Sequence, residues 1–202
     1  DGPYEVVGLE ITNEGELFKG VIYYPPQEHE PPHPVVIYFH GFPQLFTLPE
    51  IVRNFRFLLD EGYAFICFNF RGYRYCEGEV SISSQVSDGL EVFKFVEKLS
   101  QENVFEENQV HLIAQDFGAY VALLTCSRST LINKLALISP IVDLKRHASH
   151  EDFPKMVHYM NRFLPGNVRG IEDVDKFVEQ HVIHEFPGQH RDFIIQAEVF
   201  SV

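Results

Sequence analysis

Residues 108–125, NQVHLIAQDFGAYVALLT, limit the folds open to this chain more than any other segment. Val110, Leu112 and Ile113 form a short apolar run that is typical of a strand buried in a parallel sheet. Residues 120–124 are apolar and crowded as in a buried helix, and they follow almost at once. Residues 114–118, AQDFG, therefore lie on a sharp turn from strand to helix, with Asp116 at its centre.

The rest of the first 145 residues alternates between strand and helix patterns. Three more apolar runs predict buried strands at residues 35–39, 64–70 and 134–139, with helical patterns between them at residues 51–59 and 87–99. Two segments at residues 5–12 and 17–24, joined by a turn at residues 13–15, predict an antiparallel hairpin. This order predicts a mostly parallel sheet flanked by helices, with right-handed crossovers.

Local signals place the helix boundaries. Thr47 and Glu50 match a capping box that opens the first helix, and Gly62 is placed to end it. Ser87-Asp88 predicts the start of the second helix. We therefore expect one continuous helix between the buried strands at residues 35–39 and 64–70, and a loop over residues 74–84.

Polar residues follow the ends of the predicted strands. They are His40-Gly41-Phe42, Arg71-Gly72, Asp116 and Asp143. In parallel sheets, ligands bind at the carboxyl ends of the strands. We therefore expect these residues to converge on one site.

Composition excludes several classes of partner. The formal net charge of −13 argues against nucleic acid and anionic membrane surfaces. Cys67, Cys76 and Cys126 are odd in number and widely spaced, which predicts free thiols in a reducing, cytoplasmic compartment. No segment reads as a signal peptide or a bilayer span. We expect no cofactor and no metal; the pairs His29/His33 and His181/His184 are the weak metal alternatives.

The pattern changes after Asp143. Residues 147–163 and 171–182 read as helices, and Leu164-Pro165-Gly166 separates them. Met156, Tyr159, Met160 and Phe163 form the expected apolar face of the first helix. We divide the chain into a core at residues 1–146, a helical cap-like segment at 147–190 and a tail at 191–202 that is strand or helix; ordinary crossover helices are the alternative to a cap.

Taken together, the motifs resemble the α/β-hydrolase superfamily over residues 5–145. ELFKGVIYYPP…HPVVIYFHGF, LLDEGYAFICFNFRGY and VHLIAQDFGAYVALL occur in that family's order and spacing. The hairpin and the segment from Arg71-Gly72 to residue 79 look like serine esterases and peptidases, whereas HGFPQ at 40–44 and the aspartate at the turn look like epoxide hydrolases and dehalogenases. The turn resembles the nucleophile elbow G-x-S-x-G, with Ala114 for the first glycine and Asp116 for the serine.

This resemblance implies a role for each matched residue. Asp116 is expected as the nucleophile and the N–H groups of Phe42 and Phe117 as the oxyanion hole. Asp143 is the candidate acid. His40, Gly41 and Tyr159 are candidates for contact with a small-molecule substrate. In the alternative interpretations, Asp116 only caps the helix that follows it, Asp143 only fixes a loop and Tyr159 is a core aromatic.

No histidine stands in the position that the resemblance requires for the catalytic base. His147, His150, His158, His181, His184 and His190 all fall in the cap-like region. The sheet is therefore expected to be incomplete at its C-terminal end, in a fragment or in a chain that completes its sheet as a homodimer. Two functions follow: a hydrolase of esters or epoxides, or a catalytically inactive binding module.

Overall fold

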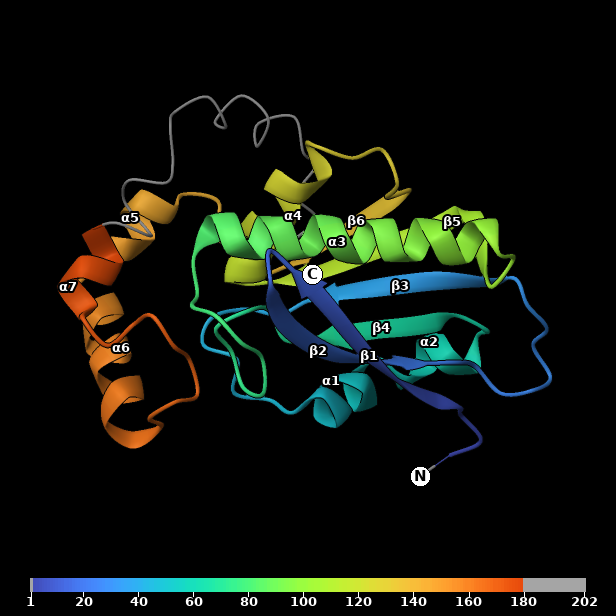
Figure 1. Cartoon of the computed structure of the whole chain (residues 1–202), viewed down its shortest axis with the longest axis horizontal. Coiled ribbons are helices and arrows are strands. Elements are labelled where there is room, and N and C mark those ends of the chain that lie inside the picture. The colour runs from blue at the N-terminus through green and yellow to red at the C-terminus, as the bar shows by residue number, and fades with distance from the viewer. Residues whose placement is uncertain (1, 180–202) are drawn as a thin grey trace.

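The computed structural model of the chain describes residues 2–179, and it contains one mixed six-stranded sheet (Figure 1). The strands are β1 (Val6–Asn13), β2 (Glu16–Tyr23), β3 (His33–Phe39), β4 (Ala64–Phe68), β5 (Phe105–Gln115) and β6 (Lys134–Ile138). Their order in the sheet is β1-β2-β4-β3-β5-β6. The first two strands pair antiparallel, β2 pairs antiparallel with β4, and β3, β4, β5 and β6 are parallel. The predicted hairpin and the mostly parallel sheet are confirmed.

Helices cover both faces of the sheet and one of its ends. They are α1 (Leu48–Asn54), α2 (Arg56–Asp60), α3 (Ile82–Gln101), α4 (Phe117–Cys126), α5 (Leu144–Ala148), α6 (Asp152–Phe163) and α7 (Val174–Lys176). One face packs against α3 and α4 and the other against α1 and α2, while α5, α6 and α7 lie beyond the carboxyl ends of the parallel strands (Figure 1).

The two faces of the sheet bury separate hydrophobic clusters. Along β3, Val35, Ile37 and Phe39 belong to the larger cluster, and the alternating residues Val36 and Tyr38 belong to the smaller one under α1 and α2. This period of two follows from the pleat of a strand. Because both faces are buried, β3 and β4 read as continuous apolar runs.

Two of the predicted helix boundaries are wrong. The first helix is divided at Phe55 into α1 and α2, although the Thr47–Glu50 capping box at its start is present. The helix expected to begin at Ser87-Asp88 begins instead at Ile82, with the Ser81 hydroxyl accepting the Ser84 N–H over 3.0 Å. Ser81 and Ser87-Asp88 are both residues that commonly precede or begin a helix. Only the packing of residues 82–86 shows that the helix starts after Ser81.

Asp88 has a structural role in the middle of α3. Its carboxylate accepts hydrogen bonds from the Arg71 backbone N–H, 2.9 Å, and from Arg71 Nε, 2.7 Å. The Arg71 side chain is 2% exposed, and its Nη1 also contacts Glu14 and Glu16 at 3.0 and 3.1 Å. Desolvation of Asp88 raises the pKa of this carboxyl, and the bonds from Arg71 and Asn13 oppose that rise. The pair ties the end of β4 to α3 and to the turn of the hairpin.

Three further expectations concern the cysteines, membrane-spanning helices and metal sites, and the described residues bear on each. Cys67, Cys76 and Cys126 are all free thiols. No helix in residues 2–179 combines the length and hydropathy needed to cross a bilayer. Within the same range, no three or more His, Cys, Asp or Glu side chains cluster in a way that could hold a metal ion. His181 and His184 lie outside the described residues, as does the tail at 191–202.

Candidate active site

Asp116 occupies a strained turn between β5 and α4. Its backbone has φ 53° and ψ −121°, in the left-handed region that residues other than glycine rarely adopt. The Asp116 N–H donates to the Ile138 carbonyl over 2.9 Å, and the Asp116 carbonyl accepts the Ala119 N–H over 3.1 Å. Such strain costs about 1–3 kcal/mol and persists where the surrounding structure enforces it, which is typical of functional sites.

The Asp116 carboxylate is bound by the loop after β3. The backbone N–H of Phe42 donates to Asp116 Oδ2 over 3.1 Å. Asp116 is the N-cap residue of α4, but its side chain makes no capping bond to that helix. Within residues 2–179, Oδ1 forms no hydrogen bond. One carboxylate oxygen is thus held by a backbone donor, and the other is free.

Two glycines allow this close approach. A Cβ atom at Gly41 would lie 2.7 Å from Asp116 Oδ2 and 2.8 Å from Asp116 Cβ. At Gly118 it would overlap the carbonyl oxygens of His40 and Phe39. The end of β3 and the start of α4 can therefore meet only because both positions lack a side chain. The role of Gly41 in substrate contact stays a prediction.

His40 supports the loop from inside the core. The residue is 1% exposed, its Nε2 accepts the Phe70 N–H over 3.2 Å, and its Nδ1 lies 2.9 Å from the Gly41 carbonyl oxygen. Because Nε2 accepts, the proton of the neutral ring is on Nδ1 and is donated to Gly41. Burial lowers the pKa of His40 to about 4. Both ring nitrogens of His40 thus hold protein groups, and its contact with a substrate stays a prediction.

Tyr38 fixes the residue that precedes Asp116. Its hydroxyl donates to Gln115 Oε1 over 2.6 Å. Burial, with smaller contributions from Cys67 and Asp116, raises the pKa of Tyr38 to about 12, so the hydroxyl keeps its proton. Nothing in the sequence marks Tyr38, which reads as one more aromatic residue of a buried strand.

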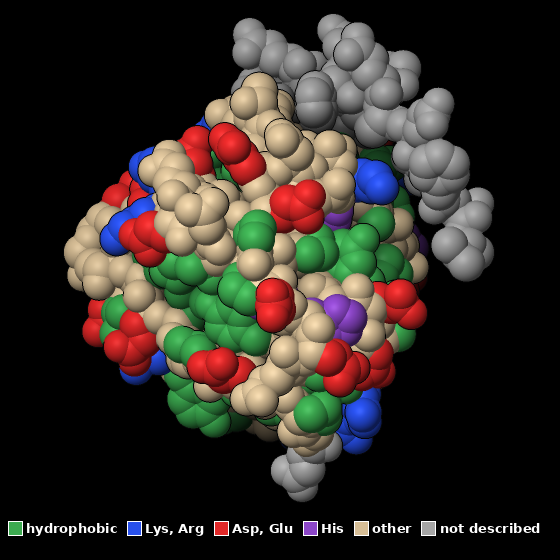
Figure 2. Space-filling model, turned by 90° about the vertical axis from the view of Figure 1, so that its right-hand side faces the viewer, with side chains coloured by type: hydrophobic (Ala, Val, Ile, Leu, Met, Phe, Trp, Pro, Cys, Tyr) green, Lys and Arg blue, Asp and Glu red, His purple; other side chains and the backbone are tan. Residues whose placement is uncertain are grey.

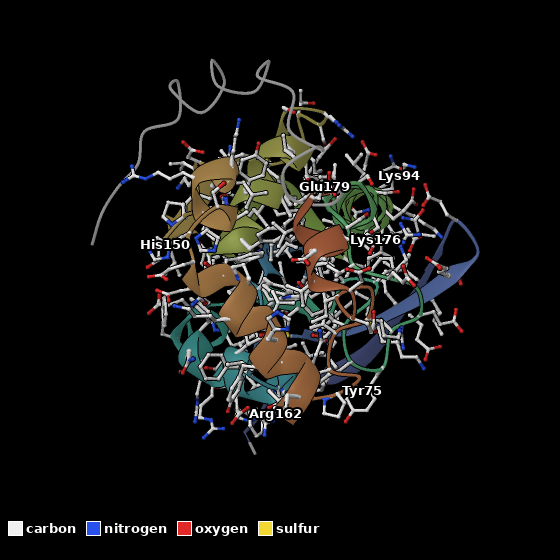
Figure 3. All side chains as sticks on the ribbon, turned by 90° about the vertical axis from the view of Figure 1, so that its left-hand side faces the viewer. Tyr75, Lys94, His150, Arg162, Lys176 and Glu179 are labelled. Carbon is white, nitrogen blue, oxygen red and sulfur yellow. The ribbon has the colours of Figure 1, made fainter. Side chains whose placement is uncertain are left out.

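An aromatic wall adjoins the carboxylate. The Phe42 ring lies 6.0 Å from Phe117, 6.0 Å from Phe153 on α6 and 5.8 Å from Phe177, measured between ring centroids. Figure 3 looks at this end of the molecule and shows α6 and α7 lying across it. The wall makes the surroundings of Phe42 apolar. The Phe117 N–H is not among the donors to the Asp116 carboxylate, and its part in an oxyanion hole stays a prediction.

The predicted apolar face of α6 is wrong in part. Phe153, Val157 and Met160 are buried, at the helical spacing i, i+4, i+7, whereas Tyr159 is 57% exposed. The Tyr159 ring packs on Phe163, which is also exposed, at 4.8 Å. Tyr159 is therefore not a core aromatic, and its contact with a substrate stays a prediction. The spacing of Phe153, Val157 and Met160 is the sequence signal that would have identified the correct face.

Asp143 serves as the N-cap of α5. Its Oδ1 accepts the Arg146 N–H over 2.9 Å, and the residue is exposed. In residues 2–179, no histidine forms a hydrogen bond with Asp143 or with Asp116. His147 is directed elsewhere, with its ring 5.3 Å from Phe153. In the described residues, the Asp116 carboxylate thus has one backbone donor and no hydrogen bond to a histidine.

A strained strand-to-helix turn at the carboxyl end of a mostly parallel sheet, beside a backbone donor from the loop after the neighbouring strand, is an arrangement typical of α/β hydrolases. The chain belongs to the α/β hydrolase fold family, whose sequence model matches residues 34–175. Lysophosphatidylserine lipase ABHD12 of Xenopus tropicalis is 27% identical over 135 residues, covering 65% of this chain and 34% of that protein. The Danio rerio protein of the same name is 26% identical over 135 residues, covering 66% and 34%. The chain spans about a third of the length of these curated relatives.

Solved structures agree on the fold. A fungal esterase from Rhizomucor miehei superposes with a TM-score of 0.60 at 15% identity, over 80% of this chain and 55% of that one. Est1E from Butyrivibrio proteoclasticus with bound ferulic acid has a TM-score of 0.60 at 18% identity, over 69% and 55%. At these identities the likeness shows the fold alone.

Proposed function

We propose that this chain carries the nucleophilic centre of a hydrolase for small organic substrates, in which Asp116 forms a covalent ester with an electrophilic sp³ carbon. One observation carries the proposal: the Phe42 N–H binds Oδ2 over 3.1 Å, and no group in residues 2–179 forms a hydrogen bond with Oδ1. A carboxylate is ionised at neutral pH, so it needs no base to become a nucleophile. An epoxide is the substrate class that suits this attack.

In the first step, the free Oδ1 attacks a carbon of the epoxide and a carbon–oxygen bond of the ring breaks. The electron pair goes to the epoxide oxygen, which takes a proton from solvent. The product is an ester in which Oδ2 is the carbonyl oxygen. Because Oδ2 already accepts the Phe42 N–H, no group has to move to bind it.

In the second step, water attacks the ester carbonyl carbon. Negative charge then develops on Oδ2, at a distance of 3.1 Å from a backbone donor that is already oriented. Collapse of the tetrahedral intermediate releases the diol and restores the carboxylate. This step needs a base for the water, and no group in residues 2–179 contacts Asp116 as a base would.

The surroundings favour an apolar substrate. Phe42, whose N–H binds the carboxylate, packs with the buried rings of Phe117, Phe153 and Phe177, so this donor lies among apolar side chains. The net charge of −13 disfavours polyanions. The relatives named as lysophosphatidylserine lipases support an organic ester as a further substrate class.

The proposal is tested by intact-protein and peptide mass spectrometry with phenyl glycidyl ether. We expect one probe mass on the peptide that contains Asp116, and no such adduct in Asp116→Asn. Asp143→Asn is the matched control, because it removes a carboxylate from the same end of the sheet. An adduct that persists in Asp116→Asn, or none in the native protein, would refute the proposal. In water enriched in ¹⁸O, turnover should place the label in the Asp116 carboxylate.

A catalytically inactive binding module is the second candidate. It is favoured by the absence, within residues 2–179, of a histidine bonded to Asp116 or Asp143. This candidate predicts that Asp116 neither forms the adduct nor exchanges oxygen with water. The same pair of mass measurements therefore separates the two functions.

A further inference from the structure

A second cleft lies at the opposite end of the sheet from Asp116. It has a volume of about 870 Å³ and is formed by the N-terminal segment, the connection between β2 and β3, and the turn that follows α3. Its wall includes Tyr4, Glu5, Tyr24, Glu30, His33 and Glu102. This is the amino end of the parallel strands, at the right of Figure 1, so the cleft is separate from the candidate active site. Its volume lies in the range of small-molecule sites.

Backbone hydrogen bonds hold the walls in place. The Tyr24 N–H donates to the Glu5 carbonyl over 2.9 Å, and the His33 N–H donates to the Val104 carbonyl over 3.0 Å. Both ends of the β2–β3 connection are thus fixed to the neighbouring segments. Between them, four prolines restrict the backbone: Pro25, Pro26, Pro31 and Pro32. A ligand would therefore meet a cleft that is already formed, and little conformational entropy would be lost on binding.

His33 presents an unused polar group to the cleft. The residue is 7% exposed, and its ring nitrogens form no hydrogen bond within residues 2–179. Burial, with the nearby His29, lowers the pKa of His33, so the ring is neutral near pH 7 and has a nitrogen that can accept a hydrogen bond. A ligand N–H donated to this nitrogen would supply the hydrogen bond that no group in residues 2–179 provides.

The remaining walls suit a positive charge on an apolar body. The Tyr24 ring stacks on Phe105 at 6.2 Å and lies 6.0 Å from the His33 ring. Three carboxylates and no Lys or Arg line the cleft. Glu102 is 3.9 Å from Lys98, whereas Glu5 and Glu30 form no ion pair within the described residues. Figure 2 views this end and shows acidic side chains spread among hydrophobic surface.

We propose that this cleft binds a small organic ammonium ion, with an N–H donated to His33, the charge near Glu5 and Glu30, and an apolar body against Tyr24. A protonated primary amine on an aromatic or aliphatic group has this chemistry. An aromatic face and carboxylates together bind such a cation, and an anion would meet three like charges.

The test is titration of the ¹⁵N-labelled full chain with phenethylammonium at neutral pH. Amide NMR shifts locate the binding, and calorimetry measures the affinity. 3-Phenylpropionate, of similar size and opposite charge, is the matched ligand. We expect saturable shifts at Tyr24, His33 and Val104 with the cation alone. Glu5→Gln and Glu30→Gln should each weaken binding about threefold. Glu97→Gln, which removes a carboxylate from α3 outside the cleft, should leave the affinity unchanged.

Two variants, His33→Leu and His33→Gln, distinguish the loss of the hydrogen-bond acceptor from a change in the shape of the cleft. The leucine variant should lose most of the affinity, and glutamine, which keeps an acceptor, should restore part of it. Equal binding of cation and anion would overturn the proposal, as would shifts outside the cleft or equal effects of Glu30→Gln and Glu97→Gln. The glutamate variants are at exposed positions, so their result does not depend on whether the His33 variants fold.

Discussion

The backbone N–H of Phe42 and Oδ2 of Asp116 lie 3.1 Å apart, although 74 residues separate them in the chain. The loop after β3 and the elbow after β5 are therefore joined before any substrate arrives. In a serine enzyme of this fold, the donor at this position would face the substrate's oxyanion. Here it faces an oxygen of the side chain itself, which is the arrangement that an ester on Asp116 requires.

Gly41→Ala should disrupt this arrangement. The new Cβ atom would lie 2.7 Å from Asp116 Oδ2, so either the loop or the carboxylate must move. We expect adduct formation at Asp116 to slow about tenfold or more, because small displacements of reacting groups are costly. The rate of mass gain with phenyl glycidyl ether measures this.

Gly8→Ala is the matched control for Gly41→Ala. Gly8 lies in β1, and a Cβ atom there would meet nothing within 4 Å. The adduct rate and the melting temperature of this variant should stay close to those of the native protein. If the two glycine variants slow the adduct equally, the close contact between Gly41 and Asp116 has no part in the chemistry.

Asp116→Ser should not produce an esterase. A serine hydroxyl needs a base, and within residues 2–179 no histidine forms a hydrogen bond with residue 116. We expect hydrolysis of p-nitrophenyl acetate to remain at the level of Asp116→Ala. A burst of p-nitrophenol from Asp116→Ser alone would show that a base reaches this position.

Acidification should destabilise the fold through His40. Its folded pKa is about 4, below the ordinary 6.5, so the unfolded chain binds this proton more readily. The stability that comes from keeping His40 neutral is therefore fully present above the unfolded pKa of 6.5. It is lost as the pH falls toward the folded pKa of about 4. Between about pH 7.5 and about pH 5.8, we expect a loss of about 1 kcal/mol from His40. His33 and His111, whose pKa values are also lowered by burial, act in the same direction.

Urea unfolding at the two pH values measures this loss. In addition, the ring resonances of His40 should not titrate over this range in the folded protein. A titration midpoint of His40 near 6.5 would contradict the buried, neutral tautomer.

Asp88→Ala should be strongly destabilising. It leaves the Arg71 guanidinium, which is 2% exposed, without its buried partner. Breaking such a pair costs about 3–5 kcal/mol. Glu91→Ala removes the exposed pair with Lys94 on the same helix and should cost about 0.5 kcal/mol or less. Equal losses of unfolding free energy in the two variants would refute a structural role for Asp88.

Phe153→Ala and Tyr159→Ala test which face of α6 is buried. Phe153 contacts Phe42 and Phe177, and its removal should cost about 3 kcal/mol of unfolding free energy. Tyr159 is exposed, and its loss should cost about 0.5 kcal/mol or less. Denaturant unfolding of both variants gives the comparison. A larger effect of Tyr159→Ala would reverse the assignment of the buried face.

Local patterns were sufficient to predict the sheet and the sharp turn between β5 and α4. Strands such as β3 and β5 are buried on both faces, so they read as apolar runs, and parallel strands place their carboxyl ends at one edge. The turn at residues 114–118 could be recognised because a strand and a helix follow each other with almost no linker. Helix starts were harder to predict, because Ser81 and Ser87-Asp88 carry similar capping signals and only Ser81 is used.

By itself, the sequence determined the mostly parallel sheet, the hairpin and the position of Asp116 at a strand-to-helix turn, since these depend on residues close together in the chain. Only the tertiary structure decided that Oδ2 of Asp116 is held by Phe42, that His40 is a neutral buried ring and that Phe153 rather than Tyr159 faces the core. The reason is physical: hydrogen bonds, desolvation and helix rotation are set by groups that are distant in sequence and meet only when the chain folds.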